Sequence, residues 1–291
     1  MKFNKIKSYA KINLSLSVIG KLKSGYHKIE SLVSFVNYYD EILIKKIRNK
    51  NHKIQFIGKF SKGINKNNTV SKLLNILDQK KMLNNQKYLI KVIKNIPQKS
   101  GLGGGSINAS AIIKFFLSKK VFNCSKNNLK NLTKKIGSDV ELGLNFKNKI
   151  LYSNGDLSTI TTKLRLFVLI VKPNFGCSTK EVYNRIKNYS PKKFNKFKHN
   201  YFNLKNILEL ENDLEKVVYK NYPKLNKLKS FLLTLPNIQF ARMTGSGSCI
   251  VGYFMSINSA KNAEKLFKKN IKIIGVLHLK LYKFFFLCYM K

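Results

Sequence analysis

A glycine-rich stretch constrains this chain more than any other feature of its sequence. In IPQKSGLGGGSINAS, residues 96–110, four glycines fall within five positions, at 101 and at 103–105. The apolar run before Pro97 is typical of a strand, and the pattern over 106–119 predicts a helix. Glycine is costly to order, but it lets a ligand approach the backbone N–H groups closely. A bare backbone before a helix N-terminus favours an anion, and we expect a polyphosphate. A tight exposed turn is the alternative.

Three well-known phosphate-binding signatures are missing from the chain. The pattern G-x-x-x-x-G-K-[ST] is absent, which excludes a Walker-type phosphate loop. A dinucleotide fingerprint counted from Gly101 fails, because Ser106 stands where the third glycine is needed. The protein-kinase signatures H-R-D and D-F-G are also absent. The glycine stretch therefore indicates another class of phosphate-binding protein.

The composition indicates a globular protein. The chain has 291 residues, of which 44% are hydrophobic, enough for one large domain or two smaller ones with a sizeable core. No apolar run reaches the roughly 18 residues of a membrane helix, and the first residues do not resemble a secretion signal. The four cysteines lie far apart, without a C-x-x-C pair. We therefore expect a reduced, cytoplasmic protein with no membrane partner and no structural zinc.

The formal net charge of +43 has two interpretations. A chain this basic is typical of nucleic-acid-binding proteins. The excess, however, is nearly all lysine, it accompanies many asparagines and isoleucines, and it is spread along the whole chain. Those three residue types share A- and T-rich codons, so we favour codon bias and expect no specific nucleic-acid partner. The charge would still attract anionic substrates by electrostatic steering.

The pattern along the chain predicts two α+β lobes that meet near residue 155. Asn154–Gly155 is a turn signal, and a buried strand follows it over 164–173. In the first half, the spacing of apolar residues predicts strands over 5–19, 31–47, 52–60 and 88–96, and helices over 70–83, 106–119 and 126–136. After the strand at 164–173, the second half is expected to form helix, basic linker, helix, strand, loop, strand, helix and strand.

Four blocks, in order along the chain, resemble the GHMP small-molecule kinases. They are the N-terminal block YAKINLSLSVIGKLKSGYHKIESLVSFVNYYDEI, the glycine stretch, the central block IGSDVELGL, and the pair NDLEKVV and ARMTGSGSCIVGYF. The resemblance covers residues 9–254, and the combination of GYH with GLGGGS is closest to the kinases of 4-diphosphocytidyl-2-C-methyl-D-erythritol. It implies a two-lobed fold, with a ribosomal-protein-S5-like N-terminal domain over 1–155 and a ferredoxin-like C-terminal domain over 156–291.

The resemblance also implies an activity. The enzyme would use ATP with Mg²⁺, the metal arriving with the nucleotide, to phosphorylate the 2-hydroxyl of 4-diphosphocytidyl-2-C-methyl-D-erythritol in the non-mevalonate isoprenoid pathway. It would work as a monomer or weak homodimer. Three alternatives stay open: a homoserine- or mevalonate-type GHMP kinase, a basic nucleic-acid-binding protein, and a decayed enzyme. The motif GYH favours the cytidyl substrate, since homoserine and mevalonate carry no cytosine.

By the same resemblance, Asp139 is the base that accepts the hydroxyl proton, and Lys11 is its catalytic partner. A strand-borne lysine next to Asp139 would keep that carboxylate ionised and stabilise charge during transfer. Asn13 lies two residues beyond Lys11 on the same strand face, and is a candidate for hydrogen bonding to the substrate. From residue type alone, Asp139 would be a helix N-cap and Lys11 a surface charge.

The family contacts ATP at positions that correspond to a set of residues around the glycine stretch. These residues are Asn68, Lys94, Pro97, Gly101, Leu102, Gly103, Gly104, Gly105 and Ser106. From the residues alone, Asn68 is also a good helix N-cap and Lys94 a solvated charge. The second glycine-rich turn, TGSGSC at 244–249, resembles the motif that shapes the floor of the site and supports the phosphate loop. A plain hairpin turn is its alternative.

Tyr26 and His27 lie in a predicted loop between two extended segments. A tyrosine can stack on a pyrimidine, and an imidazole can hydrogen-bond to its edge. By resemblance these two residues bind the cytosine, and Tyr183 is the second aromatic residue that closes on it. Without the family, the expected reading is a tyrosine packed on the core and a solvated histidine.

Three positions depart from the family pattern. Tyr9 and Glu141 stand where the family usually has proline, and Ile107 stands where it usually has a second serine after the glycines. Ile107 removes a hydroxyl near the expected phosphates and so weakens the case for a magnesium ion held by serine, although Ser106 and the backbone N–H groups remain. We name no metal ligand from the protein. The proposed acid–base pair is unchanged by all three departures.

Overall fold

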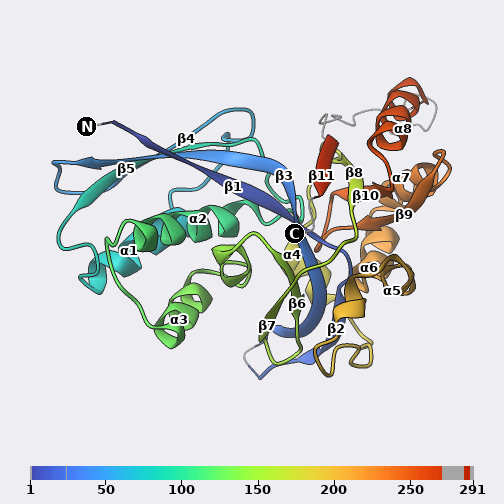
Figure 1. The fold of residues 1–291 in the computed structure, drawn as a ribbon, viewed down its shortest axis with the longest axis horizontal. Helices are drawn as coiled ribbons and strands as arrows, with labels where there is room; N and C mark the ends of the chain where they lie inside the picture. Colours follow the sequence, from blue (N-terminus) through green and yellow to red (C-terminus); the bar gives the residue numbers. More distant parts are fainter. Residues whose placement is uncertain (1, 24, 271–284, 289–291) are drawn as a thin grey trace. The chain divides into compact units, whose positions relative to one another are not determined.

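The computed structural model describes residues 2–23, 25–270 and 285–288 (Figure 1). Within that part the chain forms two compact units, neither of which is continuous in sequence. Unit 1 contains residues up to 10, 38–98 and 103–146, and unit 2 contains residues 11–37, 99–102 and those from 147 onward. The sequence-based division after residue 155 follows chain order and stays a prediction.

Unit 1 combines strands with helices that cover one of their faces (Figure 1). Its elements are the first part of β1 (Asn4–Asn13), the second part of β3 (His27–Ile47), β4 (Lys53–Ile57), α1 (Thr69–Gln79), β5 (Lys87–Ile93), α2 (Gly104–Ser118), α3 (Lys126–Ile136) and the 3-10 helix η1 (Glu141–Leu144). Strand β5 pairs antiparallel with β3 and parallel with β4.

The core of unit 1 follows from the residue pattern of these elements. In β5 the sequence KYLIKVI buries Tyr88, Ile90 and Val92 on one face, as alternation predicts. Helices α1, α2 and α3 contribute apolar side chains to the same core, among them Leu74 and Ile112. Predicted site residues lie at the N-terminal ends of two of these helices: Asn68 is the N-cap of α1, and Gly104, Gly105 and Ser106 are the first residues of α2.

Unit 2 is built around a four-stranded antiparallel sheet in the order β11-β8-β10-β9. Its elements are the second part of β1, β2 (Ser17–Lys21), the first part of β3, β6 (Asn148–Leu151), β7 (Leu157–Ile160), β8 (Leu166–Val171), α4 (Thr179–Asn184), η2 (His199–Phe202), α5 (Leu204–Glu209), α6 (Leu214–Asn221), α7 (Pro223–Leu233), β9 (Ile238–Met243), β10 (Ile250–Phe254), α8 (Ile257–Asn270) and β11 (Phe285–Cys288).

The sheet of unit 2 buries its apolar residues against helices. Leu169 and Ile250 of the sheet belong to one core with Leu214, Leu228 and Phe267, which come from α6, α7 and α8. Strand β8 reads LFVLIV, and all but one of its residues are buried, as expected for a strand covered on both faces. The first part of β3 pairs with β2 and β6.

Several predicted boundaries differ from the structure. The strand expected over 5–19 is two strands, β1 and β2. The helix expected over 70–83 ends at Gln79, where the turn that follows bonds back to the helix through the N–H groups of Lys81 and Met82. The hairpin β6–β7 around the Asn154–Gly155 turn was not predicted, because its strands are short and carry polar residues.

The single helix expected after the basic linker is three helices, α5, α6 and α7. Pro223 occupies the first turn of α7, where its missing N–H costs nothing, so it separates α6 from α7. Within the described residues no helix is both long and apolar enough to cross a membrane.

Candidate active site

The glycine stretch forms the N-terminus of α2 in unit 1. The helix begins at Gly104, two residues before the predicted start, with Gly103 as its N-cap in the left-handed conformation at φ 70°. No side chain caps this end of the helix. Its first N–H groups therefore have no partner within the helix and can bind an anion. Thr69 of α1 braces the turn by donating from Oγ1 to the Gly105 carbonyl oxygen at 2.7 Å.

Lys94 lies beside this glycine end. Its side chain is buried and forms an ion pair with Asp40, which is fully buried. The reading of Lys94 as a solvated charge is therefore wrong. A Cβ added to Gly104 would lie 3.2 Å from the Lys94 ammonium nitrogen, so the charge stands against the first turn of α2. Burial lowers the pKa of Lys94, and Asp40 opposes that shift.

Asp40 is a residue that the sequence reasoning missed. Besides pairing with Lys94, its Oδ1 accepts hydrogen bonds from the N–H groups of Asn95 and Ile96, both at 2.7 Å. One carboxylate thus fixes the segment between β5 and the glycine stretch, directly before the buried Pro97. The block NYYDEI contained this signal, since an aspartate among apolar strand residues is rarely buried without a partner.

Asn68 caps α1. Its Oδ1 accepts from the N–H groups of Val70 and Ser71, at 3.0 and 3.1 Å, and the Ser71 hydroxyl accepts from the Asn68 N–H to complete a capping box. The side-chain nitrogen donates to the carbonyls of Asn65 and Lys66. The helix-cap reading of Asn68 is confirmed, and its contact with ATP stays a prediction.

Replacing Asn68 separates the two roles. We expect Asn68→Ala to lower the free energy of unfolding by about 1 kcal/mol, because both capped N–H groups lose their acceptor, whereas Asn68→Ser should change it by only a few tenths. Urea unfolding of both variants measures this. Equal destabilisation by Ser and Ala would contradict the capping account, and weaker ATP binding by Asn68→Ser would support a nucleotide contact.

Asp139 lies in a turn between α3 and η1. The turn is held to α2 by Ser110, whose hydroxyl donates to the carbonyls of Ser106 at 3.0 Å and Val140 at 2.5 Å. A Cβ at Gly137 would lie 3.4 Å from the Ser106 hydroxyl. The backbone around Asp139 is therefore fixed against the first turns of α2, near the glycine end, and the N-cap position of η1 is Val140.

The Ile107 side chain matters for the expected metal contact, because it stands in place of a serine hydroxyl. It is fully buried and packs towards Gly143 of η1, where a Cβ would lie 3.0 Å from its Cδ1. Position 107 thus contributes to the core of unit 1. Of the two serines that the family pattern places here, the one present in this chain is Ser106, in the first turn of α2. In the described part of the chain, no three His, Cys, Asp or Glu side chains group as a metal site would require.

Lys11 is buried in unit 2, which rules out the surface reading. Its ammonium group donates to Asn13 Oδ1 at 2.5 Å, and its backbone N–H donates to the Leu102 carbonyl at 3.1 Å. Asn13 in turn donates from Nδ2 to Ser31 at 2.8 Å and from its N–H to Thr244 at 3.0 Å. Asn13 therefore positions Lys11, while its predicted contact with substrate stays a prediction.

The second glycine-rich turn packs on residues 99–101 of the glycine stretch. Ser248 N–H donates to the Lys99 carbonyl at 3.3 Å, and Cys249 N–H donates to the Ser100 carbonyl at 3.2 Å. Gly101, at φ +76°, lies so close that a Cβ there would be 1.9 Å from the Thr244 carbonyl oxygen. This turn does more than close a hairpin, because its backbone shapes the start of the glycine stretch.

Asn212 holds the second glycine-rich turn, residues 244–249, through hydrogen bonds. Its Nδ2 donates to the carbonyls of Met243 and Gly245, both at 2.8 Å, and its Oδ1 accepts from the Leu214 N–H at the start of α6. The block NDLEKVV does not by itself indicate a role for Asn212. The role of a buried asparagine that donates to carbonyls on a distant turn can be recognised only once the fold is known.

His27 and Tyr183 come together in unit 2. Their ring centroids lie 5.2 Å apart, and Tyr189, which was not predicted, lies 6.4 Å from His27. Burial, with Lys21 nearby, lowers the pKa of His27 from its ordinary value, so the imidazole is neutral at pH 7. Tyr26 is 73% exposed. The neutral ring can both donate and accept hydrogen bonds, as a cytosine edge requires.

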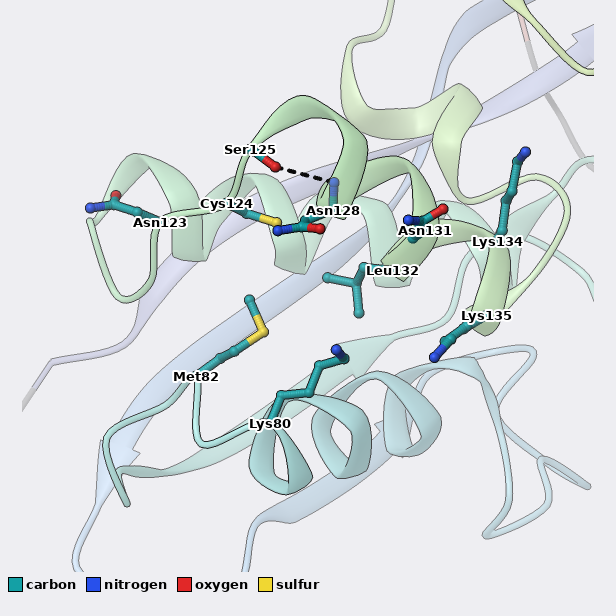
Figure 2. A pocket seen from close by; sticks show the side chains of 10 residues that line it. All are labelled: Lys80, Met82, Asn123, Cys124, Ser125, Asn128, Asn131, Leu132, Lys134 and Lys135. Atoms are coloured by element: carbon teal, nitrogen blue, oxygen red, sulfur yellow. Dashed lines mark hydrogen bonds between the residues drawn. The ribbon is translucent and has the colours of Figure 1, made fainter.

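A pocket of about 970 Å³ opens elsewhere in unit 1 (Figure 2). It is lined by Lys80, Met82, Asn123, Cys124, Ser125, Asn128, Asn131, Leu132, Lys134 and Lys135. Figure 2 shows Lys80 and Lys135 pointing toward one another, but both are exposed. None of the predicted site residues lines it. Asn68 lies at the opposite end of α1 from Lys80, about 18 Å away along the helix, so this pocket is separate from the glycine end of α2.

Comparison with known proteins places these features in a family. The GHMP kinases N terminal domain matches residues 68–145, and the GHMP kinases C terminal domain matches residues 197–272. A 4-diphosphocytidyl-2-C-methyl-D-erythritol kinase of Pelagibacter ubique (strain HTCC1062) is 52% identical over 91% of this chain and 94% of its own length. The chain belongs to the 4-diphosphocytidyl-2-C-methyl-D-erythritol kinase family of GHMP kinases.

Two further comparisons agree with this membership. A kinase of the same family from Thermoanaerobacter pseudethanolicus is 30% identical over 92% of this chain and 93% of its own length. The crystal structure of a 4-(cytidine 5'-diphospho)-2C-methyl-D-erythritol kinase superposes with a TM-score of 0.74 at 20% identity, covering 91% of this chain and 96% of that chain. The expected α+β GHMP kinase fold is confirmed, and the protein is an ATP-dependent small-molecule kinase.

Proposed function

We propose that this protein phosphorylates the 2-hydroxyl of 4-diphosphocytidyl-2-C-methyl-D-erythritol with ATP, giving the 2-phosphate and ADP, as a step of the non-mevalonate isoprenoid pathway. The observation that best supports this choice of substrate is the 52% identity to a kinase of that name over nearly the whole of both chains. The residues around the glycine end of α2 support it, because they offer groups that phosphoryl transfer needs: backbone donors, the buried cation of Lys94 and a carboxylate on a turn held to α2.

We propose that the phosphates of ATP lie on the glycine stretch. The uncapped N-terminus of α2 offers N–H donors and the positive end of the helix dipole, and Lys94 adds a buried charge beside Gly104. Mg²⁺ arriving with the nucleotide would help to neutralise the charge of the phosphates. Ser106 is the hydroxyl of this turn that could approach the metal.

In this proposal Asp139 accepts the proton of the substrate 2-hydroxyl. The hydroxyl oxygen then forms a bond to the γ-phosphorus while the bond from that phosphorus to the β,γ-bridging oxygen breaks, and ADP leaves with the electron pair. Lys11 stabilises the negative charge that develops during transfer. Its ammonium group is pre-set by Asn13, so no reorganisation is needed at the moment of reaction.

The cytosine of the substrate would lie against His27 and Tyr183. We expect Tyr183→Ala and His27→Ala each to raise KM for the cytidyl substrate about tenfold, because stacking and edge contacts to a base are worth on the order of 1–3 kcal/mol each. KM for ATP should stay within twofold. Steady-state kinetics with each substrate varied in turn measures this, and equal changes in both KM values would argue against a cytosine site here.

Product analysis tests the reaction itself. With ATP, Mg²⁺ and the cytidyl substrate, ³¹P NMR should show a new phosphomonoester, and mass spectrometry should place it on the methylerythritol part of the molecule. A phosphate on the ribose, or release of inorganic phosphate alone, would contradict the proposal. The cytoplasmic location, the monomeric or weakly dimeric state and the lack of a specific nucleic-acid partner stay predictions.

A further inference from the structure

Lys172 is a buried lysine that the proposed mechanism does not use. It follows directly after β8 in unit 2 and is 6% exposed. Its ammonium group donates to the carbonyls of Pro173, at 2.7 Å, and Phe175. Within the described residues no carboxylate pairs with it. A lysine buried without an acidic partner is rare, so its role calls for an explanation.

The two thiols near Lys172 do not balance its charge. Burial raises the pKa of Cys177 to about 11 and that of Cys249 to about 12, so both thiols are neutral at pH 7. The partners of Lys172 are thus two carbonyl groups, two residues apart in one turn. An ammonium group carries three donors and can join such a pair, which fixes the turn over 173–175.

That turn supports the second glycine-rich turn. The Phe175 carbonyl, which accepts from Lys172, also accepts from the Ser248 hydroxyl at 2.6 Å. Gly176, the next residue, packs so closely on Lys99 that a Cβ at 176 would lie 2.4 Å from the Lys99 Cβ. Lys172 therefore fixes the Phe175 carbonyl, which accepts from Ser248, and the backbone at Gly176, against which Lys99 packs.

Ser248 and the next residue connect the turn over 173–175 to the glycine stretch through hydrogen bonds. Its N–H donates to the Lys99 carbonyl at 3.3 Å, and the next N–H, of Cys249, donates to the Ser100 carbonyl at 3.2 Å. Thr244, at the other end of the same turn, donates to the Gly101 carbonyl at 3.2 Å. Two consecutive hydrogen bonds thus connect the Phe175 carbonyl, through Ser248, to the residues that open the glycine stretch.

We propose that Lys172 is a positioning residue for ATP binding: by holding the Phe175 carbonyl beneath Ser248, it fixes residues 99–101 in the conformation that receives the phosphates. This inference rests on the proposed function, in which the glycine stretch binds ATP. A backbone site of this kind depends on placement within a few tenths of an ångström, because peptide N–H groups cannot adjust as side chains do. Replacing Lys172 should therefore lower the affinity for the nucleotide and leave the affinity for the cytidyl part of the substrate unchanged.

Calorimetric titration of the whole chain tests this, with adenylyl imidodiphosphate and Mg²⁺ as one probe and cytidine diphosphate as the other. Lys172→Met removes both hydrogen bonds and keeps the apolar stem. Lys172→Gln keeps a hydrogen-bond donor without the charge, and it replaces Lys172→Met in the titrations if that variant does not fold. Lys268→Met is the matched control, since it removes a lysine of the same unit that pairs with Glu264 on α8.

We expect Lys172→Met to raise Kd for the ATP analogue about tenfold or more, Lys172→Gln to recover part of that loss, and cytidine diphosphate binding to stay within twofold. Lys268→Met should leave both affinities unchanged. An unchanged Kd for the analogue in folded Lys172→Met, or an equal loss for both probes, would overturn the role of Lys172. Absence of analogue binding by the unmodified protein would instead overturn the proposed function.

Discussion

Asp139→Asn is expected to lower kcat about a thousandfold while ATP binding stays within threefold. The amide has nearly the same shape, so the turn held by Ser110 should keep its structure. It cannot accept the hydroxyl proton, however, and a positioned general base contributes on the order of 10²–10⁴-fold in rate. Single-turnover measurements with saturating ATP would show the loss in the chemical step itself.

Glu141→Gln provides the matched control for Asp139. It removes a carboxylate two residues further on, in η1. We expect its kcat to remain within twofold of the unmodified enzyme. Near-normal turnover by Asp139→Asn, or an equal loss in both variants, would remove Asp139 as the base.

Gly101→Ala is expected to destabilise the protein by about 4 kcal/mol and to abolish measurable ATP binding, which places it among the largest single-residue effects. Two causes act together. The residue has φ +76°, which costs an alanine about 1–2 kcal/mol, and its Cβ would lie 1.9 Å from the Thr244 carbonyl oxygen. The obstructing atom is backbone, so relief requires the two glycine-rich turns to move apart.

Gly155→Ala separates the two causes. Gly155 has a similar φ of +83°, but nothing lies within 4 Å of an added Cβ. We expect its free energy of unfolding, measured in urea, to fall by only about 1–2 kcal/mol and its ATP binding to be unchanged. Equal stability losses in the two alanine variants would show that close packing of Gly101 on Thr244 contributes nothing.

The sequence predicted features that depend on local pattern. The strand, Pro97, glycine turn and helix of the proposed phosphate site follow from neighbouring residues, and the structure differs mainly in starting α2 at Gly104. That difference has a local cause, because Gly103 takes the left-handed N-cap conformation and the next two glycines can then be helical. The pairing of His27 with Tyr183 came from the family resemblance and not from spacing.

The features that escaped prediction depend on contacts between distant segments. With 56 Lys+Arg in the chain, composition could not single out Lys94 or Lys172 as buried. The pairing of Lys94 with Asp40 requires β3 and β5 to lie side by side, and the bonds from Asn212 to the 244–249 turn require α6 to pack beneath it. Such partners are fixed by tertiary structure, which the spacing of residues along the chain does not report.

Release of ADP by the purified protein is the most direct test of the central claim. It would be followed with ATP and Mg²⁺ in parallel reactions containing 4-diphosphocytidyl-2-C-methyl-D-erythritol, homoserine or mevalonate, with Asp139→Asn as the inactive reference. We expect turnover with the cytidyl substrate and none above background with the other two. Turnover with homoserine or mevalonate instead, or none with any substrate from a folded protein that binds ATP, would contradict it.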